Sequence, residues 1–246
     1  MPKPPQDKSA DTSADTPPDP TPHTPAEPRS EAATQLLRVA GRLFAERGVD
    51  GVTVRQIADA AGQKNHAAVG YHFGSKEALV RALVQDGAML IDQRRNAWLD
   101  TLEADGGPHS VREVVDVLIQ AGIQLGPPGQ PEHYNRFVVL LGMTHRADFM
   151  AALDGRWNAG YLRCLAHLRR LMPAMPTALQ NQRFVFMGAY LGGVLAARDA
   201  ELADTSRAHP TWRAERTLQH FAATMTALLV CPADLTPSTV LKRAVA

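Results

Sequence analysis

Cysteine is nearly absent from this sequence of 246 residues. Only Cys164 and Cys231 are present, and they do not form a C-x-x-C pair. A disulfide framework or a zinc site is therefore not expected, and we expect no bound metal. So few thiols are typical of a chain that folds in a reducing compartment, and the sequence favours a cytoplasmic protein.

Long apolar runs and an excess of one charge are also missing. The longest apolar run, residues 184–197, has 14 residues, whereas a membrane-spanning helix needs roughly 20. The first residues contain no apolar stretch, so no secretory signal is expected. The formal net charge is only +1, which excludes a strong overall attraction to nucleic acid but leaves room for a local basic surface.

The familiar catalytic patterns are absent as well. The sequence contains no H-E-x-x-H, G-x-S-x-G, P-loop or dinucleotide fingerprint. Its nine histidines are scattered without metal-ligand spacing. We therefore expect a protein that is not an enzyme and that carries no cofactor.

The most informative segment that is present spans residues 53–76, TVRQIADAAGQKNHAAVGYHFGSK. Thr53 and Gln56 form a T-x-x-Q capping box, which predicts a helix that begins at Val54. Gly62 is suited to ending that helix. A second short helix is expected to carry Asn65, His66, Ala67, Gly70, Tyr71 and His72, with Gly74 ending it and Ser75 capping the next helix.

Two short helices joined by a tight turn form a helix-turn-helix, whose second helix can enter the major groove of DNA. Around this segment, residues 31–90 resemble the TetR family of bacterial transcriptional repressors. The resemblance rests on the pattern LLRVAGRLFAERGVDGVTVRQIADAAG together with YHFGSKEAL. Between Ala61 and Phe73 the chain is one residue longer than the tightest family pattern, and it resembles a subgroup with AGQ-x-N-x-x-AV-x-YHFGSKEAL.

Two kinds of DNA contact are expected from this segment, because phosphate contacts position a protein and base contacts specify the sequence. Basic and helix-capping residues suit the phosphates, whereas small, amide and basic residues at the start of the recognition helix suit base edges. The predicted DNA-binding residues are Thr53, Arg55, Gln63, Lys64, Asn65, His66, Ala67, Gly70, Tyr71, His72 and Lys76.

No alternating pattern persists along the chain, so the expected fold is all-α. Residues 1–29 contain nine of the 18 prolines and are predicted to be a disordered tail. Residues 30–90 are expected to form a three-helix DNA-binding domain and 91–232 a helical effector-binding and dimerisation domain, with a loose tail at 233–246. Within the second domain, helical segments are predicted at about 110–125, 134–146, 147–172, 177–200 and 210–230.

The resemblance implies that the last two long helices form the interface of a homodimer. Their apolar residues assign that interface to Phe184, Met187, Tyr190, Leu191, Val194, Leu218, Phe221, Met225 and Leu228. An effector pocket is expected among the central helices, where polar and aromatic groups are available. The candidates for it are Tyr134, Arg136, His145, Trp157 and Tyr161.

These features predict a ligand-responsive homodimeric repressor that a small-molecule effector releases from a palindromic operator in double-stranded DNA. Two alternatives remain open at this point. One is an enzyme with an all-α fold. The other is a helical dimer that binds partner proteins and has no specific affinity for DNA.

Overall fold

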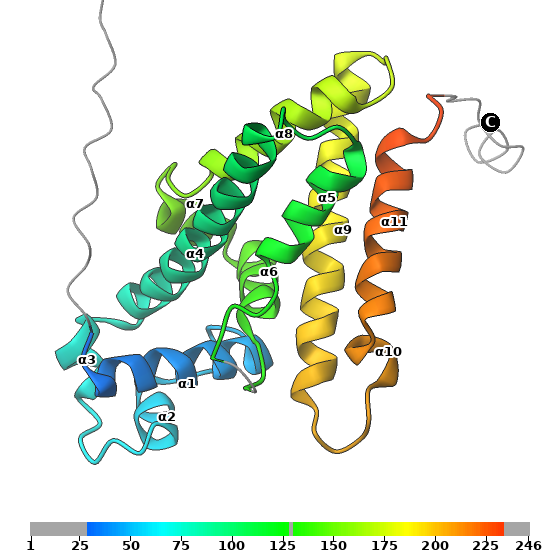
Figure 1. Ribbon diagram of the computed structural model, residues 1–246. Coiled ribbons are helices and arrows are strands. Elements are labelled where there is room, and N and C mark those ends of the chain that lie inside the picture. Colours follow the sequence, from blue (N-terminus) through cyan, green and yellow to red (C-terminus); the bar gives the residue numbers. More distant parts are fainter. Residues whose placement is uncertain (1–28, 128–129, 234–246) are drawn as a thin grey trace, which may run out of the picture.

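The computed structural model describes residues 29–127 and 130–233, and over these residues it contains helices and no strand. The all-α prediction is confirmed, whereas the tails predicted at 1–29 and 233–246 lie almost wholly outside the described residues. No helix in the described part of the chain combines the length and apolarity needed to cross a membrane. The helices shown in Figure 1 are α1 (Glu31–Arg47), α2 (Val54–Ala60), α3 (Ala68–Phe73), α4 (Lys76–Ala104), α5 (Val111–Ala121), α6 (Tyr134–Thr144), α7 (Arg146–Leu153), α8 (Ala159–Leu171), α9 (Thr177–Ala203), α10 (Pro210–Arg213) and α11 (Glu215–Val230).

The first three helices lie together at one end of the molecule (Figure 1). Ser30 caps α1 by accepting a hydrogen bond from the backbone N–H of Ala33 at 3.2 Å. The apolar face of α1 is buried against α2, α3 and the first turns of α4. Phe137, Leu141 and Ala152 from α6 and α7 complete the same core, so the amino-terminal helices do not form an isolated unit.

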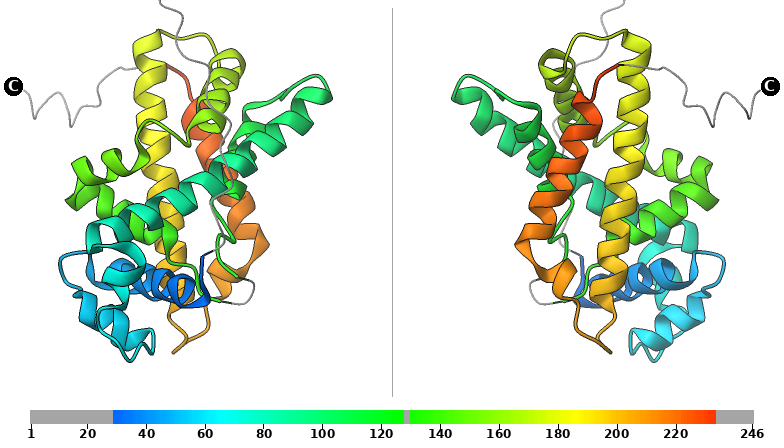
Figure 2. Two further views of the ribbon diagram at one scale, coloured as in Figure 1. Left: turned by 90° about the vertical axis from the view of Figure 1, so that its left-hand side faces the viewer. Right: turned by 90° about the vertical axis from the view of Figure 1, so that its right-hand side faces the viewer.

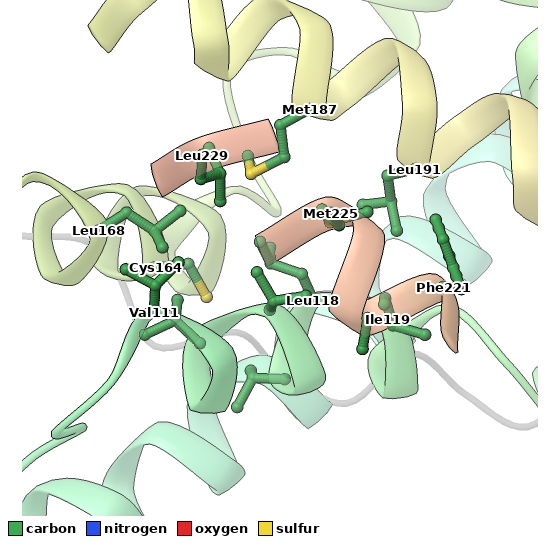
Figure 3. Packing of buried hydrophobic residues seen from close by; sticks show 14 of the residues in the cluster. Val111, Leu118, Ile119, Cys164, Leu168, Met187, Leu191, Phe221, Met225 and Leu229 are labelled. Carbon is green, nitrogen blue, oxygen red and sulfur yellow. The ribbon is translucent and has the colours of Figure 1, made fainter. Parts of the chain in front are cut away.

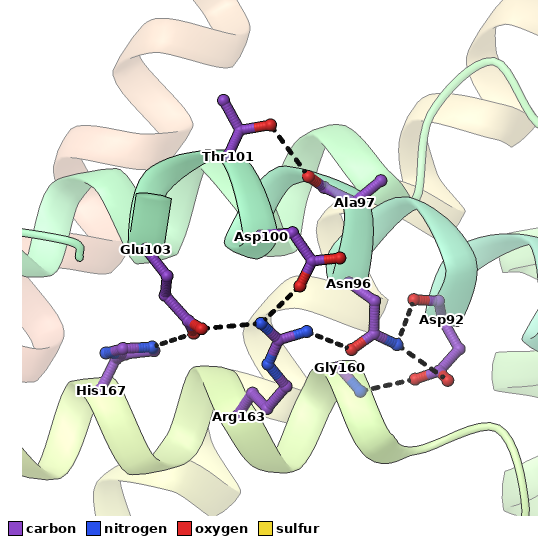
Figure 4. Close-up of polar contacts among 9 residues, drawn as sticks. All are labelled: Asp92, Asn96, Ala97, Asp100, Thr101, Glu103, Gly160, Arg163 and His167. Atoms are coloured by element: carbon purple, nitrogen blue, oxygen red, sulfur yellow. Dashed lines mark hydrogen bonds and ion pairs between the residues drawn. The ribbon is translucent and has the colours of Figure 1, made fainter. Parts of the chain in front are cut away.

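The long helix α4 leaves this end and crosses to α8, to which a row of polar contacts joins it (Figure 4). The Arg163 guanidinium donates to Asn96 and Asp100, both at 2.7 Å, and to Glu103 at 2.9 Å. At the start of α8, the backbone N–H of Gly160 donates to Asp92 Oδ1 of α4 at 2.8 Å. These bonds hold the second half of α4 against α8.

The second core lies between α5, α8, α9 and α11 (Figure 3). Its largest fully buried side chains include Leu118, Leu168, Met187, Met225 and Leu229. Arg183 of α9 is only 5% exposed, and its guanidinium donates to the Leu229 carbonyl oxygen at 2.6 Å. An arginine in this position satisfies a carbonyl at the end of α11 that would otherwise lack a partner.

The central helices differ from their predicted bounds in two places. The helix expected at about 110–125 ends at Ala121, and the segment expected at 147–172 is divided into α7 and α8. Asp154, Gly155 and Trp157 all have positive φ between those two helices. A single helix cannot pass through residues in that conformation, so α7 ends at Leu153 and α8 begins at Ala159.

Helices α9 and α11 run side by side as an outer layer, seen in the right-hand view of Figure 2. Five of the residues assigned to the dimer interface are buried inside the protomer, where they face α5 and α8. A side chain buried in its own core has no surface left for a partner, so the structure corrects the assignment for these five. They are Phe184, Met187, Leu191, Phe221 and Met225.

The outward surface of the layer is carried by other residues. On α9, Val185 is 68% and Phe186 is 59% exposed. Tyr190, Val194, Leu218 and Leu228 are partly buried beside the core. The exposed positions that we define as the outer face are Val185, Phe186, Ala189 and Gly193 on α9 and Ala223, Ala227 and Val230 on α11.

A buried carboxyl group connects α9 to α6. Asp199 is 2% exposed and accepts a hydrogen bond from the backbone N–H of Asn135 at 3.0 Å. Burial, with a smaller effect of the nearby Glu132 carboxylate, raises the pKa of Asp199 from its ordinary 3.8 to about 6. Between these two values the native state binds more protons than the unfolded chain, so the stabilising contribution of this group is lost as the pH rises through about 6.

Asp199→Asn removes the ionisation while keeping an acceptor for the Asn135 N–H. We expect the free energy of unfolding of the variant, relative to the unmodified protein, to increase by about 2 kcal/mol on going from pH 4 to pH 7. Urea unfolding followed by circular dichroism across that range measures the difference. A difference between the two proteins that stays constant with pH contradicts the expectation.

Candidate nucleic-acid interface

Helix α2 begins where its capping box predicts. The backbone N–H of Gln56 donates to Thr53 Oγ1 at 3.2 Å, and the Thr53 N–H donates to Gln56 Oε1 at 2.8 Å. Ile57 and Ala58 are fully buried on one side of the helix. Arg55 points away from that core, with its side chain 75% exposed and only a 3.8 Å contact to Asp59.

The turn after α2 is held by its own backbone and side chains. Gly62 has φ +69°, and the Gln63 N–H donates back to the Ala58 carbonyl oxygen at 2.9 Å, which is a Schellman ending. Further along, Asn65 Oδ1 accepts from the Ala67 N–H at 2.9 Å. His66 Nε2 lies 2.7 Å from Asp59 Oδ1, which connects the turn to α2.

These bonds correct the predicted start of the recognition helix. Helix α3 begins at Ala68, so Asn65, His66 and Ala67 belong to the turn rather than to the helix. The physical reason is that the Asn65 side chain bonds to the backbone two residues on, a local alternative to a helical hydrogen bond.

Helix α3 has two different sides. Ala68 and Val69 are buried, and Phe73 packs against the amino-terminal core. Tyr71 is 84% exposed, and its ring meets the edge of the His72 ring at a centroid distance of 4.9 Å. Beside it, a Cβ at Gly70 would meet nothing within 4 Å. A short helix that exposes a tyrosine next to an open glycine can approach a flat or grooved partner closely.

The start of α4 borders this surface. Gly74 has φ +80°, and Ser75 Oγ accepts from the Ala78 N–H at 3.1 Å, as its predicted capping role requires. Hydrogen bonds from its own backbone N–H and from Ser75 lower the pKa of Glu77. Lys76 is half-exposed at the same helix end.

The predicted effector residues do not come together. Tyr134 lines a cavity of about 590 Å³ between α1, α4 and α6, whereas the other four lie outside its lining. His145 Nε2 instead lies 3.1 Å from Asp50 Oδ2, next to the helix-turn-helix. Sequence reasoning missed most of the residues around this cavity, because they come from helices far apart in the chain.

Tyr161 has a different neighbour, Arg95 of α4. The Arg95 guanidinium lies over the Tyr161 ring at 5.4 Å from its centroid, and its Nε has no hydrogen-bond partner among the described residues. Burial lowers the pKa of Arg95 and raises that of Tyr161. Within the described ranges no cluster of three or more His, Cys, Asp or Glu side chains could hold a metal ion.

Comparison with known proteins identifies relatives of the helix-turn-helix part. Residues 36–83 match the model of bacterial regulatory proteins, tetR family. Over 80 residues the chain is 39% identical to the HTH-type transcriptional repressor KstR2 of Mycolicibacterium smegmatis, which is 32% of this chain and 38% of that protein. Over 54 residues it is 44% identical to the HTH-type transcriptional repressor AcnR of Corynebacterium efficiens, which is 22% of this chain and 28% of that protein. The chain thus matches well under half the length of these curated relatives.

The likeness to solved structures extends over more of the chain. The structure of AibR in complex with isovaleryl coenzyme A and operator DNA has a TM-score of 0.52 and 18% identity. It covers 82% of this chain and 100% of that chain. At this identity the likeness concerns the fold, and it includes the helices that follow residue 83.

Proposed function

We propose that this chain, which belongs through its helix-turn-helix to the tetR family of bacterial regulatory proteins, is a sequence-specific transcriptional repressor that responds to a small-molecule effector. Its relatives KstR2 and AcnR are named as repressors, which supports the direction of regulation. Such a protein acts in the cytoplasm, where bacterial DNA lies. The function requires no catalytic group.

The observation that carries the proposal is the exposed side of α3 on a rigid support. Tyr71 and Gly70 face outward, while Ala68, Val69 and Phe73 anchor the helix to the core. A helix held in this way offers base and phosphate contacts without first becoming ordered. The residues proposed to contact DNA remain those predicted above, with Asn65, His66 and Ala67 acting from the turn.

The outer face of α9 and α11 is the proposed dimer interface. It combines two large apolar side chains, Val185 and Phe186, with small residues that let two helices approach closely. A pair of helices from each of two copies would bury this face in a four-helix arrangement. A two-fold dimer reads two inverted half-sites, which is the reason to propose a palindromic operator.

Helix α6 is the proposed connection between effector and DNA. It packs against both α1 and α9, and so contacts the DNA-binding core and the outer layer together. The His145–Asp50 contact adds a second connection to the loop before α2. An effector that favours one position of α6 would change how the two α3 helices of a dimer are placed. AibR has been solved in complex with isovaleryl coenzyme A and operator DNA, which supports the proposal that a small molecule acts on the DNA binding of this chain.

Selection of binding sites from random double-stranded DNA tests the proposal directly. At about 0.15 M salt we expect enrichment of an inverted repeat with half-site centres about 34–36 Å apart, and an affinity that falls steeply as salt increases. Analytical ultracentrifugation of the complex is expected to show two protomers per site. A selection that recovers no sequence above random DNA, from a folded dimer, would instead favour a helical dimer that binds partner proteins.

A further inference from the structure

A cavity lies between α1, which belongs to the proposed DNA-binding helices, and the helices α4 and α6. Its volume is about 590 Å³, within the range of about 300–1,000 Å³ that is usual for small-molecule sites. It is open to solvent on one side and is lined by α1, the first half of α4, the start of α6 and the chain that precedes α6.

The walls of the cavity are largely apolar. Leu37, Leu83 and Leu90 contribute aliphatic groups, and Phe137 contributes a ring from α6. Gly41 lies in the wall formed by α1, where a Cβ would meet only Leu83 Cδ2, at 3.5 Å. The missing side chain at this position leaves room for a hydrophobic ligand body.

The polar rim of the cavity is basic. Arg38 is exposed and donates to two amide oxygens, Gln35 Oε1 at 2.6 Å and Gln130 Oε1 at 2.7 Å. No carboxylate pairs with Arg38 among the described residues. Its full positive charge therefore remains available to an anion.

The carboxylates at the rim already have basic partners. Asp86 pairs with Arg29, and Glu132 lies 3.8 Å from Arg198 Nη1. On the outer turn of α1, Arg42 lies 3.6 Å from Glu46. The charges at the rim cancel in pairs except at Arg38. An approaching ligand therefore meets the positive guanidinium of Arg38 at the entrance to an apolar cavity.

We infer that this cavity is the effector site, and that it binds a small amphipathic anion whose acidic head meets Arg38 and whose apolar body lies between α1, α4 and α6. That the ligand acts as an effector rests on the proposed function. That a ligand binds rests on the cavity alone.

The position of the cavity explains how such a ligand would act. Leu37 and Gly41 belong to α1, and α1 also packs against α2 and α3. A ligand in the cavity contacts α1 directly, so the response does not need to pass through the distant core of α9 and α11. Movement of α1 would carry the recognition helix with it because they share one core.

A pair of fluorescent probes tests the inference on the full-length protein without DNA. 8-Anilinonaphthalene-1-sulfonate has an aromatic body with an anionic head, and N-phenyl-1-naphthylamine has the same body without the charge. We expect both to bind at one molecule per protomer, with the sulfonate bound more tightly. Arg38→Gln is expected to weaken the sulfonate about tenfold, the usual effect of losing one charged hydrogen bond, and to leave the neutral probe within about twofold.

Two further variants separate the charge from the space. Gly41→Leu fills the cavity from a helical position that gains in helix propensity, and it is expected to abolish the binding of both probes. Arg47→Gln removes an exposed arginine of the same helix that does not line the cavity, and it is expected to leave both affinities unchanged. Circular dichroism confirms that each variant is folded.

The outcomes are distinct from those for DNA binding. Failure of the folded protein to bind either probe overturns the inference, as does a Gly41→Leu variant that binds both probes normally. Equal affinity for the two probes overturns the assignment of an anionic head. Operator selection with the same preparations is an independent measurement. A protein that selects an operator but binds no probe would overturn the assignment of the cavity as a ligand site and would leave the proposed repressor function standing.

Discussion

Tyr71→Ala is expected to weaken binding to a selected operator by about 10- to 100-fold while leaving the protein folded, as for the loss of one hydrogen bond to a charged group. The side chain is 84% exposed, so removing it costs little stability. Its neighbours on the inner side of α3, Ala68 and Val69, are untouched by the change. Fluorescence anisotropy with a labelled operator measures the affinity.

Salt dependence distinguishes this tyrosine from the basic residues around it. A phenol carries no charge, so Tyr71→Ala is expected to lower the affinity equally at all salt concentrations. Lys64→Ala, at an exposed cation in the turn, is expected to reduce the slope of log affinity against log salt by about 0.9 for one phosphate contact. Tyr71→Phe separates the hydroxyl from the ring. An unchanged affinity for Tyr71→Ala at every salt concentration would show that α3 does not face the DNA.

Gly87→Ala is expected to destabilise the protein by about 3 kcal/mol, although alanine is the better helix former. The position lies inside α4, and a Cβ there would overlap the ring of Tyr134. That ring cannot simply move aside, because its hydroxyl donates to the Val84 carbonyl oxygen at 3.0 Å. Displacing it would also disturb the contact of α6 with α4 next to the cavity.

Gly41→Ala is the matched control, since it places the same methyl group inside α1. Its Cβ would lie 3.5 Å from Leu83 Cδ2, an ordinary contact, so a gain of up to about 1 kcal/mol is expected. In a Tyr134→Ala background, Gly87→Ala should become neutral or stabilising. Urea unfolding of the unmodified protein, the two single variants Gly87→Ala and Tyr134→Ala, and the double variant completes this double-mutant cycle. If Gly87→Ala costs as much without the Tyr134 ring, the steric explanation is wrong.

Much of the fold could be predicted because its signals are local. The capping box of Thr53 and Gln56 and the left-handed Gly62 and Gly74 each act within a few residues. The bounds of α1 and α2 and the start of α4 match the predictions for this reason. The start of α3 did not, because the Asn65 side chain competes with the helix for a backbone N–H.

The sequence by itself determined that the chain is helical and that it contains a helix-turn-helix, since capping, helical periodicity and glycine conformation need no distant partner. Only the tertiary structure decided which sides of α9 and α11 face outward, because both helices have apolar residues on more than one side. It also decided where a ligand fits. The cavity exists because residues from α1, α4 and α6 approach one another across long stretches of chain, and no local pattern records how much space remains between them.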